Sequence, residues 1–307
     1  MFDKILFATT ATPACDHAAH VAFDLAKKYN SSLQLFHVFG LPSHGFGQQV
    51  TDVRTGKADD YGTAYIEAIK KELQEMYAEE IGENSSYKIE SVIGVPHREV
   101  LRLARKENSD LIVMGAHSRQ EEPGATRYRS VVGSTMQRVA KGARCPVLIV
   151  SRPCTTCLWY FSNIIFGTDF SKASYSAFLF AYKLAKEIGS KLWLFHALDI
   201  SAMHAGKTLE QDEIEDRIAK ARQKIEDTYI SQMTDYDNYE IDVLEGIPYV
   251  EILKYARAKN GDLIVMSHHT REVDPEQALL GSTVEQVVLR ASCPVASVNR
   301  PDKVAVD

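Results

Sequence analysis

Apolar and polar positions along this chain follow two alternating periods. Short apolar runs rich in β-branched residues recur through the sequence, and longer amphipathic stretches separate them. Short apolar runs bounded by polar turns are typical of buried strands. The expected strands lie at residues 4–9, 32–38, 87–92, 110–115 and 146–151, and again at 163–168, 191–197, 239–244, 262–267 and 294–299.

Between the expected strands, the apolar pattern changes to a helical period. Residues 64–77 and 214–229 carry apolar side chains three or four positions apart on an otherwise charged sequence. That spacing marks a surface helix with one buried stripe. Strands such as Leu111–Met114 are apolar at every position, which favours helices on both faces of the sheet. The alternation predicts an α/β fold with a parallel sheet.

The second half of the chain repeats the first. Ile5–Thr9 matches Ile164–Thr168, and Asp110–Met114 matches Asp262–Met266. Further matches follow in the same order: Gly94–Pro96 with Gly246–Pro248, Gly133–Thr135 with Gly281–Thr283, and Cys145–Val147 with Cys293–Val295. The repeat predicts two copies of one domain, at 1–152 and 162–302, joined by a linker at 153–161.

Composition excludes several classes of protein. The 307 residues suffice for about two average domains. The 35 Lys+Arg against 41 Asp+Glu give a net charge of −6, without the excess of basic residues that a general nucleic-acid binder carries. No apolar run approaches the ~20 residues that span a bilayer. We therefore expect neither nucleic acid nor membrane as a partner, and, since the first residues are typical of a strand rather than a signal peptide, a cytoplasmic location.

The cysteines do not predict a disulfide framework. Their number, five, is odd, and Cys145 and Cys293 occupy matching Cys-Pro-Val sequences that indicate packing roles. Cys154 and Cys157 form a Cys-x-x-Cys pair between the two copies. Such a pair can be half a zinc site or a redox pair, but structural zinc needs four ligands and no second pair exists in the sequence. We interpret this pair as part of the linker.

The histidines are interpreted as structural residues. His37 and His196 end the second strand of each copy, where a hydrogen-bonded core histidine is a more common finding than a proton shuttle. His268 and His269 are adjacent at a strand end, so their side chains point to opposite sides and do not form a metal pair.

One segment of each copy carries a family motif. Residues 110–119 read Asp-Leu-Ile-Val-Met-Gly-x-His-x-Arg, and the later Gly-Ser-Thr and Cys-Pro-Val blocks occur twice. In this order, the blocks resemble the universal stress proteins in their tandem two-domain form. The resemblance implies two Rossmann-like or flavodoxin-like domains of the HUP type, each a five-stranded parallel sheet with helices on both faces. It implies ATP binding in some members and does not imply catalysis.

Members of this family that bind ATP resemble the pattern Gly-x2-Gly-x9-Gly-Ser/Thr, in which glycines let backbone amides approach phosphates. The first copy keeps Gly115 and Gly133 but has Ser118 at the second glycine, with an insertion between Ser118 and Gly133. Thr10 stands there in place of the family's aspartate, which contacts the nucleoside. The second copy keeps that aspartate, Asp169, and loses the first two glycines.

By this resemblance, each copy contributes one set of nucleotide-binding positions. The first set is Thr10, Val38, Met114, Gly115, His117, Ser118, Arg119, Gly133, Ser134 and Thr135. The second set is Thr168, Asp169, Ala197, Ser267, Arg271, Gly281, Ser282 and Thr283. We expect phosphate to favour the first copy, because serine and threonine replace glycine in the second. We predict no catalytic residue and no resident metal, and Mg²⁺ only together with ATP.

The last strand of each copy is expected to be an edge of its sheet. An exposed apolar edge is a liability unless it is paired or covered. The two edges therefore predict an internal pseudo-dimer, as in the family's homodimers, and leave open a further homodimer and an unknown protein partner. The function predicted is a non-catalytic, cytoplasmic stress-response protein with degenerate ATP sites. The alternatives are a weak nucleotide hydrolase and an interaction protein with empty pockets.

Overall fold

The computed structural model describes residues 2–12, 15–40, 49–51, 58–60, 63–82, 86–116, 133–151, 161–199, 210–267 and 282–298. Contacts divide the chain into two compact units, which we call unit 1 (Met1–Ser151) and unit 2 (Arg152–Asp307). Each unit is an α/β domain built on a parallel sheet, so the predicted fold class is confirmed. The domain limits 1–152 and 162–302 and the linker 153–161 stay predictions, since residues 152–160 and 299–307 lie outside the described ranges.

Unit 1 builds its sheet outward from the first strand. Along the chain its elements are β1 (Lys4–Thr9), α1 (Asp16–Tyr29), β2 (Ser32–Gly40), β3 (Gln49–Thr51), β4 (Ala58–Asp60), α2 (Thr63–Met76), α3 (Ala78–Gly82), β5 (Tyr87–Gly94), α4 (Pro96–Lys106), β6 (Leu111–Gly115), α5 (Ser134–Gly142) and β7 (Val147–Val150). The parallel strands lie in the order β7-β6-β1-β2-β5. The strand order reverses between β1 and β6, which is where an open α/β sheet leaves a crevice.

Unit 2 repeats this topology. Its elements are β8 (Asn163–Gly167), α6 (Lys172–Ile188), β9 (Lys191–Leu198), α8 (Gln211–Thr228), the 3₁₀ helix η2 (Ile230–Gln232), β10 (Tyr239–Glu245), α9 (Pro248–Ala258), β11 (Leu263–Met266), α10 (Ser282–Arg290) and β12 (Val295–Ser297). The strand order is β10-β9-β8-β11-β12, all parallel, with the reversal between β8 and β11. Every expected strand is therefore present, close to its predicted ends.

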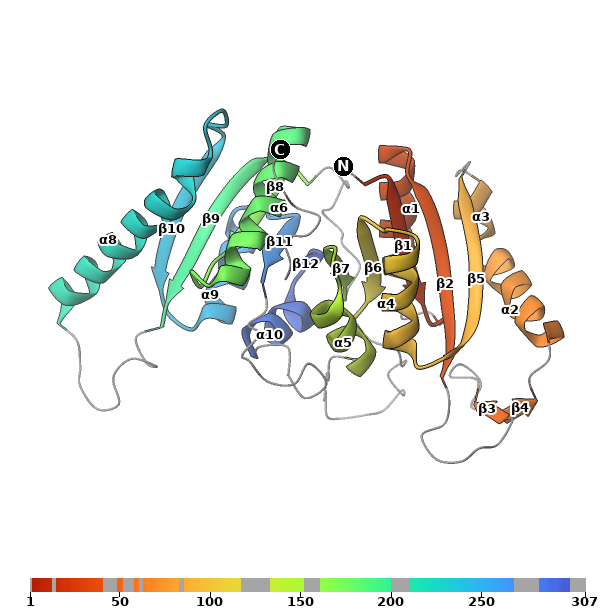
Figure 1. Ribbon diagram of the computed structural model, residues 1–307. Helices are drawn as coiled ribbons and strands as arrows, with labels where there is room; N and C mark the ends of the chain where they lie inside the picture. Colours follow the sequence, from red (N-terminus) through yellow and green to blue (C-terminus); the bar gives the residue numbers. More distant parts are fainter. Residues whose placement is uncertain are drawn as a thin grey trace. The chain divides into compact units, whose positions relative to one another are not determined.

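Helices lie on both sides of each sheet (Figure 1). In unit 1, α1 packs on β1, β2 and β6, whereas α4 packs on β2 and β5 and against α5. In unit 2, α6 packs on β8, β9 and β11, and α9 packs on β9 and against α10. The two helices predicted at 64–77 and 214–229 correspond to α2 and α8. The antiparallel pair β3–β4 is too short and polar for the apolar pattern to predict it.

In each unit, an aspartate anchors the amino end of the first strand. The Asp110 carboxylate accepts hydrogen bonds from the backbone N–H groups of Asp3, at 3.1 Å, and Lys4, at 3.0 Å. Asp262 accepts equivalent bonds from Ser162 and Asn163. These aspartates open the strand-four motif but lie at the opposite end of the sheet from the crevice. Their role is therefore structural.

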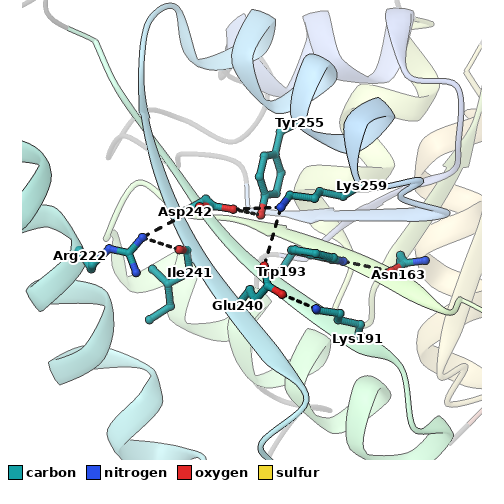
Figure 2. Close-up of polar contacts among 9 residues, drawn as sticks. All are labelled: Asn163, Lys191, Trp193, Arg222, Glu240, Ile241, Asp242, Tyr255 and Lys259. Atoms are coloured by element: carbon teal, nitrogen blue, oxygen red, sulfur yellow. Dashed lines mark hydrogen bonds and ion pairs between the residues drawn. The ribbon is translucent and has the colours of Figure 1, made fainter.

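Unit 2 also contains a charged network around a buried tryptophan (Figure 2). The Nζ atoms of Lys191 and Lys259 lie 4.3 and 4.2 Å from the ring centroid of Trp193. The Tyr255 hydroxyl donates to Asp242 Oδ2 over 2.6 Å, and Lys259 Nζ lies 3.5 Å from the same oxygen. This network connects β9, β10 and α9.

Candidate functional site

The carboxyl ends of β1, β2 and β6 enclose a cavity of about 150 Å³ in unit 1. Predicted positions that line it are Thr10, Val38, Met114, Gly115, Gly133, Ser134 and Thr135. The other predicted positions of this copy, His117, Ser118 and Arg119, lie outside the described residues. The topology thus gathers side chains from strand ends and a helix start that are far apart in the sequence.

One wall of the unit 1 cavity is the start of α5. Gly133 is the residue before the helix, and it supplies no side-chain cap. The first amides of a helix have no partner within the helix and carry its positive dipole end. Ser134 and Thr135 line the cavity at this point. A hydrogen-bond donor surface for an anion is therefore present on this wall.

The end of β1 in unit 1 presents neutral polar groups. Thr10 Oγ1 lies 2.9 Å from Thr12 Oγ1 and 3.2 Å from Cys15 Sγ. Cys15 is buried, lies just before α1 and lines the cavity. Among the described residues that line the cavity there is no carboxylate, lysine or arginine. The described wall of this site is therefore uncharged apart from the helix dipole.

The equivalent cavity in unit 2 is larger, about 280 Å³, and lies at the carboxyl ends of β8, β9 and β11. Predicted positions that line it are Thr168, Asp169, Ala197, Ser267 and Thr283. Ser282 begins α10. Arg271 and Gly281 lie outside the described residues. Both units therefore place their described site positions around a cavity at the predicted crevice.

A carboxylate distinguishes the unit 2 cavity. Asp169 Oδ1 accepts a hydrogen bond from the backbone N–H of Ser171 at 3.0 Å and a short one from the hydroxyl of Ser174. Ser174 Oγ also lies 3.0 Å from Ser267 Oγ. Ser267 is the residue that replaces the first glycine of the family pattern. Its hydroxyl is thus linked through Ser174 to the aspartate.

Sequence reasoning did not assign to the site the side chains that lie behind these positions. Ser174 in unit 2 and Cys15 in unit 1 both line the cavities and contact Asp169 and Thr10, respectively. The spacing from Thr10 to Cys15 equals that from Asp169 to Ser174, so extending the repeat into the first helix of each copy would have paired them. Their polar role was not visible because neither belongs to a motif.

Both strand-end histidines are hydrogen-bonded to backbone, as predicted. Nδ1 of His37 lies 3.0 Å from the carbonyl oxygen of Thr9, and Nδ1 of His196 lies 2.8 Å from that of Thr168. Because a carbonyl oxygen only accepts, Nδ1 carries the proton in each. Burial lowers the pKa of His196 from 6.5, which favours the neutral ring.

The structure describes two of the four remaining cysteines and part of the chain in which a metal site could lie. Cys145 and Cys293 are buried, which confirms their packing role, and burial raises the pKa of Cys293 to about 12. Cys154, Cys157, His268 and His269 lie outside the described residues. Within the ranges described, no cluster of three or more His, Cys, Asp or Glu residues is placed to hold a metal ion. Nor does any helix in those ranges have the length and apolar character needed to cross a membrane.

Comparisons with known proteins agree with this fold and its duplication. A model of the universal stress protein family matches residues 1–151 and 161–299. A universal stress protein of Methanocaldococcus jannaschii is 30% identical over 160 residues, covering 50% of this chain and 84% of that relative. A second one from the same organism is 36% identical over 90 residues, covering 28% of this chain and 46% of that relative.

Solved structures share the fold along the whole chain. The crystal structure of a universal stress protein from Archaeoglobus fulgidus aligns with a TM-score of 0.67 at 19% identity, covering 97% of each chain. The family match covers both repeats, and the structural match spans nearly the full length. The chain therefore belongs to the universal stress protein family, as a member with two tandem copies of the domain.

Proposed function

We propose that this chain is a non-catalytic stress-response protein that binds an adenine nucleotide, ATP, in its strand-end cavities, with phosphate favouring unit 1. One observation carries the proposal. The family resemblance assigns nucleotide-binding positions in both copies, and each of those whose side chain the structure describes lines one of two equivalent cavities. The cytoplasmic location predicted from the sequence stays part of this proposal.

Unit 1 fits the phosphate part of a nucleotide better than unit 2. Its cavity meets the uncapped start of α5, and the lining residues that the structure describes include no carboxylate. In unit 2, the Asp169 carboxylate faces the cavity and repels a phosphate group. A carboxylate instead accepts hydrogen bonds from hydroxyl groups, so Asp169 fits the sugar of a nucleoside. The two units would thus favour different parts of the same ligand.

The non-catalytic part of the proposal rests on the chemistry of the lining. Hydrolysis requires a positioned nucleophile or water, a base and stabilisation of the phosphate charge. The described lining residues include no lysine or arginine to stabilise phosphate charge, and Asp169 is engaged by Ser171 and Ser174. This described lining supports binding rather than turnover. A weak nucleotide hydrolase, with Mg²⁺ arriving together with ATP, is the runner-up.

Nucleotide content after mild purification, together with ATP titration by calorimetry, tests the proposal. Wild type should carry or bind ATP without releasing phosphate. Gly133→Val should weaken ATP binding, because a Cβ at residue 133 already contacts the Ala116 carbonyl oxygen at 3.4 Å and the two further methyl groups of valine take up space beside the helix start that lines the cavity. Asp169→Asn is the matched unit 2 variant and should weaken adenosine more than ATP. A wild type that binds neither ligand overturns the proposal in favour of an interaction protein, and steady phosphate release favours the hydrolase.

Assembly forms a separate part of the proposal. Within their own units, β7 and β12 are edge strands, which is the premise of the predicted internal pseudo-dimer. The pairing itself stays a prediction from the sequence. Light scattering of the whole chain distinguishes a monomer, in which only internal pairing operates, from a homodimer.

A further inference from the structure

The same buried contact closes the end of the first strand in both units. The Tyr77 hydroxyl lies 2.9 Å from Thr9 Oγ1, and the Tyr229 hydroxyl lies 2.6 Å from Thr168 Oγ1. All four residues are buried, with exposures of 8% or less. Each tyrosine directly follows the long helix between the second and third parallel strands, α2 in unit 1 and α8 in unit 2. The end of that helix is therefore tied to the end of the central strand.

The threonine in this contact also holds the backbone of the next turn. Thr9 Oγ1 accepts a hydrogen bond from the Ala11 N–H at 3.0 Å, and Thr168 Oγ1 accepts one from the Phe170 N–H at 2.9 Å. A hydroxyl oxygen has two lone pairs and one hydrogen. The amide takes one lone pair, and the tyrosine hydroxyl engages either the second lone pair or the hydrogen. The tyrosine thus fixes the rotamer in which threonine can hold the turn.

This turn has a conformation that needs support. Ala11 has φ 55° and Phe170 has φ 61°, in the left-handed region that residues other than glycine rarely adopt. A conformation of this kind persists where surrounding contacts determine it, and such positions cluster at ligand sites. The residue held between the threonine and the left-handed residue is Thr10 in unit 1 and Asp169 in unit 2. Both line their cavities.

We propose that Tyr77 and Tyr229 are positioning residues of the two ligand sites: through Thr9 and Thr168, their hydroxyls hold the turn that presents Thr10 and Asp169 to the ligand. The inference rests on the proposed function for the identity of that ligand. The two copies differ at the presented residue and at the left-handed residue, yet both keep the tyrosine, the threonine and the histidine on the threonine carbonyl.

Burial keeps the tyrosine hydroxyls in the protonated form that this contact needs. The pKa of Tyr229 is raised to about 12, and that of Tyr77 is raised as well, in both cases chiefly by burial. In unit 2, the turn has further support from Phe170, whose ring lies 6.3 Å from that of Tyr229 and 4.7 Å from that of His196. Tyr229→Phe therefore keeps the ring packing and removes the hydroxyl alone.

The test compares Tyr229→Phe and Tyr77→Phe with Tyr182→Phe. Tyr182 is the matched control, because it is a buried tyrosine of unit 2 whose hydroxyl donates to Asp235 over 2.9 Å and which does not line the cavity. Two quantities are measured: hydrogen exchange of the Phe170 and Ala11 amides, and affinity for adenosine and ATP by calorimetry.

Tyr229→Phe should speed exchange of the Phe170 amide by about three- to ten-fold and weaken adenosine by a similar factor, the size expected from one neutral hydrogen bond. Tyr77→Phe should do the same for the Ala11 amide and for ATP. Tyr182→Phe should change neither quantity. Unchanged exchange, or faster exchange with unchanged affinity, would overturn the positioning role.

The outcome is separable from that of the proposed function. If wild type binds neither adenosine nor ATP, the proposed function fails, and exchange alone decides the inference. Faster exchange confined to Phe170 in Tyr229→Phe and to Ala11 in Tyr77→Phe would then support the positioning role. If all three variants speeded exchange equally at both amides, the effect would be a general loss of stability, and the positioning role would be overturned.

Discussion

The hydroxyl oxygens of Ser174 and Ser267 lie 3.0 Å apart and join the first turn of α6 to the end of β11 across the unit 2 cavity. Ser174 also donates to Asp169, so three polar side chains form one connected wall. Of the three, only Asp169 is the residue that the family's nucleotide pattern has at its position, since Ser267 replaces a glycine. The copy that lost the first glycine thus uses the replacement serine to support the aspartate that it kept.

Replacing Ser174 by alanine tests this wall. Ser174 is almost fully buried, and its hydroxyl bonds both Asp169 and Ser267. Ser174→Ala should lower the free energy of unfolding of unit 2 by about 1–3 kcal/mol, since it removes a buried hydroxyl together with its hydrogen bonds to the charged Asp169 carboxylate and to Ser267. Urea denaturation measures the change. Ser231→Ala, at an exposed serine, is the control and should stay within about 0.5 kcal/mol of wild type. Equal effects would show that the wall adds no stability.

If Cys154 and Cys157 are only part of the linker, replacing them should have no measurable effect. The double change to serine should leave the melting temperature and the metal content unaltered, because a single Cys-x-x-Cys pair supplies only half the ligands of structural zinc. Calorimetry and metal analysis by mass spectrometry measure both. Stoichiometric zinc in wild type that is lost in the variant would contradict the interpretation.

Features that depend on neighbouring residues in the sequence could be predicted, whereas contacts between residues far apart along the chain could not. Strands such as Leu111–Met114 were predictable because complete burial leaves an uninterrupted apolar run. The duplication located equivalent strand ends, and the family resemblance then pointed to Thr10 and Asp169. Both lie in the cavities found in the structure.

Contacts that depend on side-chain direction were not predictable. Tyr77 and Tyr229 fit the apolar stripes of their helices, so the sequence placed them in the core, as found. Nothing in the stripe shows that each hydroxyl reaches a threonine more than sixty residues away, at the end of another element. Pairs such as these follow from the topology of the sheet, which brings the helix end and the strand end together.

The charged network of unit 2 predicts an order of stability effects. Asp242→Ala should lower the free energy of unfolding by about 1–3 kcal/mol, since it leaves the buried Tyr255 hydroxyl without its acceptor and removes a carboxylate beside Lys259. Tyr255→Phe removes the donor instead and leaves Asp242 its cations, so about 1 kcal/mol is expected. Asp216→Ala, which breaks an exposed pair with Lys220, should cost under about 0.5 kcal/mol.

Chemical denaturation of the three variants checks this order. The network is held together across β9, β10 and α9 (Figure 2), so a change at Asp242 reaches more partners than a change at Asp216 on a helix surface. If Asp242→Ala were as mild as Asp216→Ala, the network would contribute no more than a surface ion pair.

Acidification should destabilise unit 2 through His196. Burial, the largest cause, lowers the pKa of His196 from its ordinary value of 6.5 in the folded chain, with Lys224 acting in the same direction and the Thr168 carbonyl and Asp169 opposing it. At a given pH below about 6.5 the unfolded chain therefore binds the proton more readily than the folded chain, and stability rises with pH wherever the unfolded state binds more protons. The contribution of a neutral His196 is complete above pH 6.5 and is lost as the pH falls from 6.5 toward the lower pKa of the folded state.

Melting temperatures between about pH 7.5 and pH 5.5 should thus fall more steeply for wild type than for His196→Asn, which keeps a donor for the Thr168 carbonyl but does not titrate. Parallel slopes for wild type and His196→Asn would show that protonation of His196 is not coupled to unfolding.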